Sequence, residues 1–140
     1  MRRTTLALAI SLVLAACGSD KRPASTGNAA DAALAERWVA LHGEYAAAME
    51  EAAGDCARAA LAVRKVNAKN ADLLATGKPR MAALRRDSTS AKWLDDATKK
   101  QIGGALDRMA PTLDSCRGNA DLSAALAEGA FERSATVQPR

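Results

Sequence analysis

Apolar side chains recur at steps of three and four residues through the first half of the chain. The pattern places them on one side of a helix: Leu34, Trp38, Leu41, Tyr45, Ala48 and Ala52. This spacing is typical of a helix that packs along one stripe, as in a coiled coil. Asn28 is a suitable N-cap, and Gly54-Asp55 interrupts the pattern with a helix-ending Gly and a new N-cap. Because one Gly inside a helix costs only about 1 kcal/mol, a single helix continuing through Gly54 also fits the sequence.

The sequence predicts two more long helices and a short one after the first helix. The second runs from Cys56 to about Ala75, where Gly77-Lys78-Pro79 should stop it, and a short helical turn over residues 80–86 follows. The third runs from about Ala91 to Cys116; residues 87–90 cap it, and Gly103-Gly104 and Pro111 weaken it. A short helix should start at residue 119 or 120 and end near 130, before a frayed tail at 132–140. The predicted fold is all-α, a small antiparallel bundle of three to four helices.

The N-terminal segment has the pattern of an export signal. Arg2-Arg3 precede an apolar run from Leu6 to Leu14, which is shorter than the roughly 20 residues of a membrane-spanning helix. The run ends in Leu14-Ala15-Ala16-Cys17, which resembles the lipobox of bacterial lipoproteins. The resemblance implies that residues 1–16 are a signal peptide and that Cys17 is lipidated and becomes the first mature residue. The alternative is ordinary secretion, with Cys17 as a bystander.

The same resemblance implies a location. In double-membraned bacteria an Asp directly after the lipidated cysteine commonly retains the protein at the inner membrane, and here that position is Gly18. We therefore expect a lipid anchor in the outer membrane, facing the periplasm, or the outer face of the cytoplasmic membrane if the source has one membrane. Residues 17–27 form a polar tether, and residues 28–131 form the helical domain.

Removal of the signal changes the charge of the chain. The full sequence carries a formal net charge of +4, and the loss of Arg2 and Arg3 leaves +2. A near-neutral, exported chain is not expected to bind nucleic acid. About a quarter of the residues are Ala, and aromatic residues make up only 3% of the chain, which predicts a thin core. Small domains with thin cores commonly depend on cross-links.

The cysteines supply one cross-link. With Cys17 lipidated, Cys56 and Cys116 remain, and an oxidising compartment favours a disulfide between them. A metal site would need ligands at suitable spacing, which the single histidine, His42, does not provide, and no base for a reactive thiol is readable. The two cysteines begin the second helix and end the third. Antiparallel packing of these helices would bring the cysteines together.

The other candidate ligand-binding and catalytic residues do not form a recognisable site. His42 and Met49 lie seven residues apart on one helical side, but one haem normally takes ligands from different elements, so we expect a surface or half-buried histidine. Glu50-Glu51 with Asp55, and Asp95-Asp96, are candidate carboxylate pairs, but adjacent residues on a helix point to different sides, which disfavours an acid–base pair. Asn67 and Asn70 on the second helix either line a polar pocket or set the helix register.

Basic residues gather between the second and third predicted helices: Lys78, Arg80, Arg85, Arg86 and Lys92. Arg80, Arg85 and Arg86 are candidates for a surface contact with anionic headgroups or with carboxylates of cell-wall peptides. A solvated loop that neutralises acidic groups of the first helix is the favoured alternative.

As a whole, the lipobox, the Asp55-Cys56 helix start and the late Cys116 resemble small helical lipoproteins of bacteria that pair a central cysteine with a C-terminal one. The resemblance implies no activity. We expect a lipid-anchored, non-enzymatic binding or structural module of the envelope, without a cofactor or metal, whose partner is an envelope protein or cell-wall component. The alternative is a carrier that holds a small ligand or cofactor between its helices.

Overall fold

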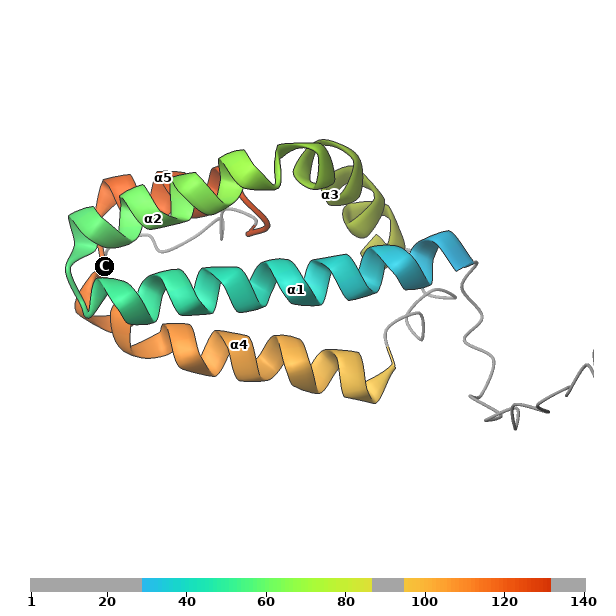
Figure 1. Cartoon of the computed structure of the whole chain (residues 1–140), viewed down its shortest axis with the longest axis horizontal. Helices are drawn as coiled ribbons and strands as arrows, with labels where there is room; N and C mark the ends of the chain where they lie inside the picture. The colour runs from blue at the N-terminus through green and yellow to red at the C-terminus, as the bar shows by residue number, and fades with distance from the viewer. Residues whose placement is uncertain (1–28, 87–94, 132–140) are drawn as a thin grey trace, which may run out of the picture.

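The computed structural model describes residues 29–86 and 95–131, and within these residues it contains five α-helices and no strand. The helices are α1 (Ala29–Ala52), α2 (Cys56–Lys69), α3 (Ala71–Arg86), α4 (Asp96–Ser115) and α5 (Ala120–Glu128) (Figure 1). The predicted all-α class is confirmed. The predicted count of three to four helices is too low, because the segment after Asn70 forms a long helix of its own.

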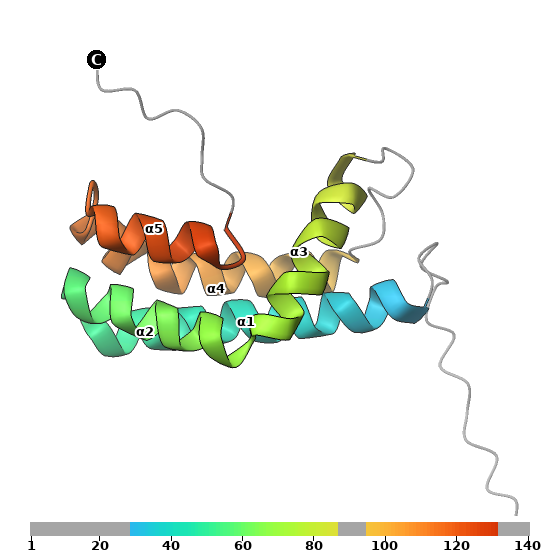
Figure 2. The same cartoon turned by 90° about the horizontal axis from the view of Figure 1, so that it is seen from above.

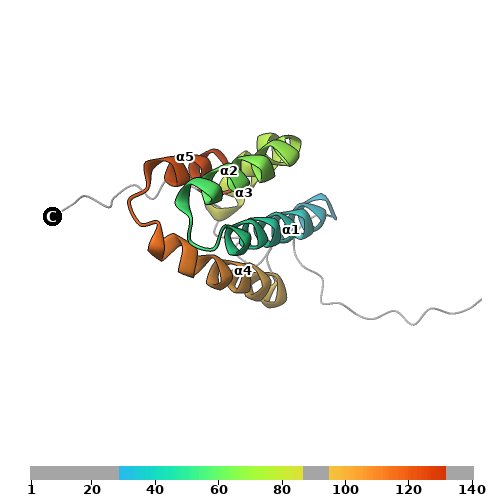
Figure 3. The ribbon, with the colours of Figure 1, turned by 60° about the vertical axis from the view of Figure 1, so that its left-hand side comes forward.

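Helix α1 lies at the centre of the arrangement. It packs against α4 on one side and α2 on the other, and α5 packs beside α2, on the side where α4 lies (Figure 2 and Figure 3). Helix α2 returns antiparallel to α1, whereas α4 runs in the same direction as α1 and α5 in the same direction as α2 (Figure 1). Helix α3 leaves the line of α2 at a steep angle, beside the N-terminal half of α1 (Figure 2). The two helix hairpins, α1–α2 and α4–α5, therefore lie next to each other with matching directions.

This topology corrects the predicted pairing of the second and third helices. We expected them to be antiparallel neighbours along their length, but α4 packs along α1 and is parallel to it. The ends that carry the cysteines still meet, because α1 ends where α2 begins and α4 ends beside that turn.

A turn separates α1 from α2, so the chain does not form one continuous helix through Gly54. Ala53 and Gly54 adopt left-handed backbone conformations, with φ of 51° and 81°, and Asp55 caps α2 by accepting hydrogen bonds from the backbone N–H groups of Ala57 and Arg58. The α4–α5 turn uses the same chemistry, with Gly118 at φ 83° and Asn119 as the N-cap of α5. Both helix breaks agree with the sequence pattern, because left-handed Gly and Asx caps act locally.

The predicted stop at Gly77-Lys78-Pro79 is wrong. Helix α2 ends earlier, with Asn70 as its C-cap, and α3 continues through Pro79 to Arg86. Contacts with other helices hold this segment helical: Lys78 Nζ donates to the Ala127 carbonyl at 2.7 Å, and Arg80 binds Asp31 of α1. These contacts on both sides of Pro79 compensate for the hydrogen bond that proline cannot donate.

The start of the third predicted helix is also displaced. Asp95 has an extended backbone and caps α4 by accepting a hydrogen bond from Thr98 N–H at 2.7 Å, so the helix does not run through it from Ala91. The predicted cap at residues 87–90 lies outside the described residues. Helix α4 then continues through Gly103-Gly104 and Pro111 and ends at Cys116, as expected.

The core is centred on α1 and is wider than the predicted stripe. Trp38, Leu41, Tyr45 and Met49 are almost completely inaccessible, and they pack with side chains such as Val63 and Met109. A stripe one side chain wide is sufficient for a helix with one neighbour. Helix α1 contacts α2, α3 and α4, so more of its surface is buried.

Candidate functional site

The disulfide joins the two hairpin turns. Cys56 is the first residue of α2 and Cys116 is the C-cap of α4; their sulfur atoms are 2.15 Å apart and their Cα atoms 5.4 Å apart. Cys116 is buried and Cys56 is half-buried. The two cysteines form the pair that the sequence predicted, and their position between two turns identifies the bond as a cross-link of the scaffold.

A polar network lies at the junction of α1, α2 and α5. The Tyr45 hydroxyl donates to Asn67 Oδ1 at 2.5 Å and accepts a hydrogen bond from the Ala130 N–H at 3.3 Å. Asn67 Nδ2 donates to the Ala125 carbonyl at 2.8 Å. Burial raises the pKa of Tyr45 to about 12, so the hydroxyl stays protonated as a donor. The contacts of Asn67 favour its predicted role in helix register over a role in lining a pocket.

Gly129 provides the space for this network. Its φ is −84°, outside the left-handed region that favours glycine. A Cβ atom would, however, lie 2.6 Å from Asn67 Oδ1 and would overlap the Tyr45 hydroxyl. No local pattern in the sequence indicates this requirement, because the atoms that impose it belong to α1 and α2.

His42 lies within an aromatic cluster, which corrects the expectation of a surface or half-buried side chain. It is only 6% exposed, and its ring centroid lies 5.4 Å from that of Phe131 and 6.1 Å from that of Trp38. Nδ1 is 2.8 Å from the Trp38 carbonyl, the geometry of an N–H donor. Burial lowers the pKa of His42; the Trp38 carbonyl opposes this effect, and the charge of Arg85 adds to it. The environment therefore favours the neutral imidazole.

The predicted carboxylate pairs are divided among separate structural contacts. Glu50 binds Arg108 of α4, with Arg108 Nε donating at 2.8 Å, and this pairing lowers the pKa of Glu50. Glu51 is exposed, Asp55 caps α2 and Asp95 caps α4. Within residues 29–86 and 95–131, no group of three or more His, Cys, Asp or Glu side chains is suitably arranged to hold a metal ion.

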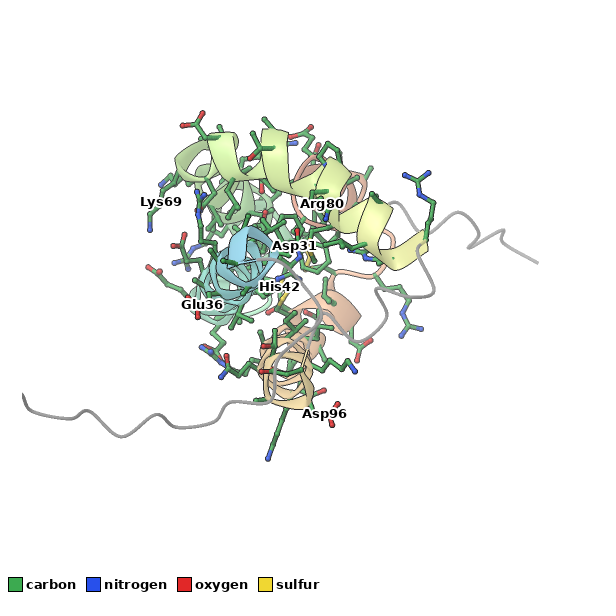
Figure 4. All side chains as sticks on the ribbon, turned by 90° about the vertical axis from the view of Figure 1, so that its right-hand side faces the viewer. Asp31, Glu36, His42, Lys69, Arg80 and Asp96 are labelled. Atoms are coloured by element: carbon green, nitrogen blue, oxygen red, sulfur yellow. A yellow bond between two sulfur atoms is a disulfide. The ribbon has the colours of Figure 1, made fainter. Side chains whose placement is uncertain are left out.

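The predicted basic surface is part of helix α3 rather than a loop. Arg80 binds Asp31 of α1 through two hydrogen bonds of 2.9 Å, from Nε to Oδ1 and from Nη2 to Oδ2 (Figure 4). This contact lowers the pKa of Asp31. Arg85 and Arg86 are exposed at the end of α3, and Arg86 Nε donates to the Ala82 carbonyl at 3.2 Å. Arg80 therefore neutralises an acidic group of the first helix, as the favoured alternative expected.

Two further residues of the predicted site, Cys17 and Lys92, lie outside the described residues. Among the helices that the structure describes, none is both long and apolar enough to cross a membrane. Comparison of the chain with protein-family models, curated proteins and solved structures found no match.

Proposed function

We propose that the protein is a lipid-anchored, non-enzymatic module of the bacterial envelope that binds a protein or cell-wall component. The observation that carries this proposal is the sequence Leu14-Ala15-Ala16-Cys17 directly after a short apolar run. Eleven residues separate Cys17 from the start of α1, and such a segment spans at most about 40 Å when extended. The helical domain would therefore work close to the membrane surface.

The described domain supports a binding or structural role. Its buried polar and ionisable side chains are all engaged in contacts of the scaffold: Asp31 with Arg80, His42 with the Trp38 carbonyl of its own helix, Tyr45 with Asn67, and Thr112 with the Met49 carbonyl. The disulfide adds a covalent link between the two hairpins. Such a scaffold presents the outer surfaces of its helices to a partner in a fixed arrangement.

Intact-mass measurement of the full chain, isolated from the envelope of a double-membraned bacterium, tests the anchor. We expect a polypeptide that begins at Cys17 and carries two or three acyl chains. Cys17→Ser should remove the acyl mass and release the protein from the membrane fraction, whereas Ser19→Ala should change neither. A mature chain with an unmodified Cys17 would contradict the proposal.

The proposed location has its own test. Because Gly18 favours the outer membrane in the lipoprotein class, Gly18→Asp should move the acylated protein to the inner membrane fraction. Crosslinking in intact envelopes should recover one specific partner with the original chain, and repeated failure to do so would count against a binding role. The carrier alternative predicts an additional bound mass in native mass spectrometry, beyond the acylated chain.

A further inference from the structure

The positive charge of the described helices is unevenly distributed. Helix α2 carries four basic residues and no acidic one: Arg58, Arg64, Lys65 and Lys69. Its neighbour α1 carries five acidic residues and a single basic one, Arg37. A helix whose charges all have one sign attracts partners of the opposite sign.

An exposed leucine lies among these charges. Leu61 is 59% exposed, the larger exposure of the two large apolar side chains that stand out on the described surface. The helical repeat places Leu61 opposite Ala59, Ala60 and Val63, the buried residues of α2. Arg58 and Lys65 lie three residues before and four residues after Leu61, so they share its exposed side.

Two of the four cations are available to a partner. Lys69 Nζ binds Glu44 at 2.8 Å, and Arg64 lies at a distant 3.9 Å from the highly exposed Asp121. The side chains of Arg58 and Lys65 are exposed and form no ion pair with any described residue. We name Arg58, Leu61, Arg64 and Lys65 the outer face of α2.

We propose that the outer face of α2 docks on anionic phospholipid headgroups. Arg58 and Lys65 would bind phosphate groups, and Leu61 between them would enter the boundary between headgroups and acyl chains. Ala57 and Ala68, also exposed, add little bulk to this side and let the helix approach the surface lengthwise. Headgroup phosphates match the cations, and the boundary with the acyl chains accepts the leucine; a face that instead binds an acidic protein would show no preference for phosphatidylglycerol vesicles.

This inference rests on the proposed lipid anchor for its biological setting. The anchor would keep the domain within about 40 Å of headgroups, and such confinement raises the effective concentration so that a weak surface contact becomes populated. The binding chemistry itself does not require acylation, so the two proposals can fail separately. The intact mass tests whether Cys17 is acylated, and vesicle binding tests whether the outer face of α2 binds anionic headgroups.

The test uses residues 17–140 with Cys17→Ser, so that no acyl chain contributes to binding. We expect sedimentation with vesicles that contain phosphatidylglycerol, weak sedimentation with pure phosphatidylcholine vesicles, and a partial decrease of binding as salt concentration rises. The double variant Arg58→Gln/Lys65→Gln should lower the partition coefficient about 25-fold, since each cation near an anionic surface contributes about fivefold. Leu61→Ser should weaken binding at high salt, where the apolar contribution remains.

The matched control is Lys99→Gln/Lys100→Gln, which removes the same charge from the exposed surface of α4. It should retain most of the binding. Equal losses for the α2 and α4 variants would overturn the proposal, because they would show a response to net charge alone. Binding no stronger to phosphatidylglycerol than to phosphatidylcholine vesicles would overturn it too. Unchanged helical circular dichroism would verify that each variant is folded.

Discussion

At the scale of single residues, Tyr45, Asn67 and Gly129 show how a few atoms align three helices. The hydroxyl of Tyr45 makes both hydrogen bonds: it donates to Asn67 of α2 and accepts from the Ala130 N–H after the end of α5. Buried hydrogen bonds of this kind are costly to break, because the group left behind has lost its contact with water. Gly129 makes none of these hydrogen bonds, but its lack of a side chain leaves the space that Tyr45 and Asn67 occupy.

Gly129→Ala should destabilise the protein by roughly 1–3 kcal/mol, because the new methyl group displaces the Tyr45 hydroxyl and Asn67. Gly104→Ala is the matched control: a methyl group there would have no heavy atom of another segment within 4 Å, and alanine favours the helix by about 0.5–1 kcal/mol. Urea denaturation measures both effects. Equal and small effects of the two substitutions would contradict the described packing around Gly129.

His42 should make stability depend on pH near neutrality. Because burial lowers its pKa in the folded state below the ordinary 6.5, the unfolded chain binds the proton more readily. The stabilising contribution is therefore complete above about pH 6.5 and is lost as pH falls. The free energy of unfolding, measured from about pH 7.5 to 5, should decrease for the original chain.

His42→Gln should flatten this pH profile, since the sequence contains only one histidine. The carboxylates with lowered pKa values, Asp31, Glu44 and Glu50, lose their stabilising contributions at lower pH, as pH falls through the ordinary values of 3.8 for Asp and 4.5 for Glu. A profile that declines equally in both proteins between about pH 7 and 5 would contradict the assigned role of His42.

At the scale of elements, local chemistry predicts the helix starts after Gly54 and near Asn119 but neither the start of α3 nor its continuation through Pro79. Asp55 and Asn119 are identifiable as N-caps because a cap depends on the two or three residues that follow it. Gly77 and Pro79, by contrast, predict a stop that the structure does not contain. A Cβ atom on Gly77 would come within 3.0 Å of Leu34 and 3.2 Å of Trp38, so this glycine allows close packing of α3 on α1. The reason lies in a different helix, far away in the sequence, and is invisible locally.

Pro79→Ala should stabilise the protein by roughly 1–3 kcal/mol, because alanine restores the missing donor inside α3. Ala83→Pro is the reciprocal control in the same helix and should cost about 3 kcal/mol or more. Thermal unfolding followed by circular dichroism compares the two. Destabilisation by Pro79→Ala would show that the proline ring itself supports the fold.

At the scale of the whole molecule, the disulfide connects two hairpins whose contacts otherwise run mainly through α1–α4 and α2–α5. Removing it with Cys56→Ser/Cys116→Ser should lower the free energy of unfolding by about 4 kcal/mol, the chain-entropy value for a loop of 60 residues. The original chain unfolded in the presence of a reductant should show a similar loss. If the double variant melts like the original under oxidising conditions, the cross-link contributes nothing and its assignment is wrong.

The order of the amino acids by itself determines three features. They are the helical class, the helix starts after Gly54 and near Asn119, and the pairing of the two cysteines. Each depends on short-range periodicity, on cap chemistry or on simple counting. Three features depend instead on how the helices pack: α4 runs parallel to α1, α3 continues through Pro79, and His42 is buried. These features depend on which helices become neighbours, and many arrangements of the same amphipathic helices satisfy one local pattern. The lipid anchor at Cys17 remains a prediction from the sequence.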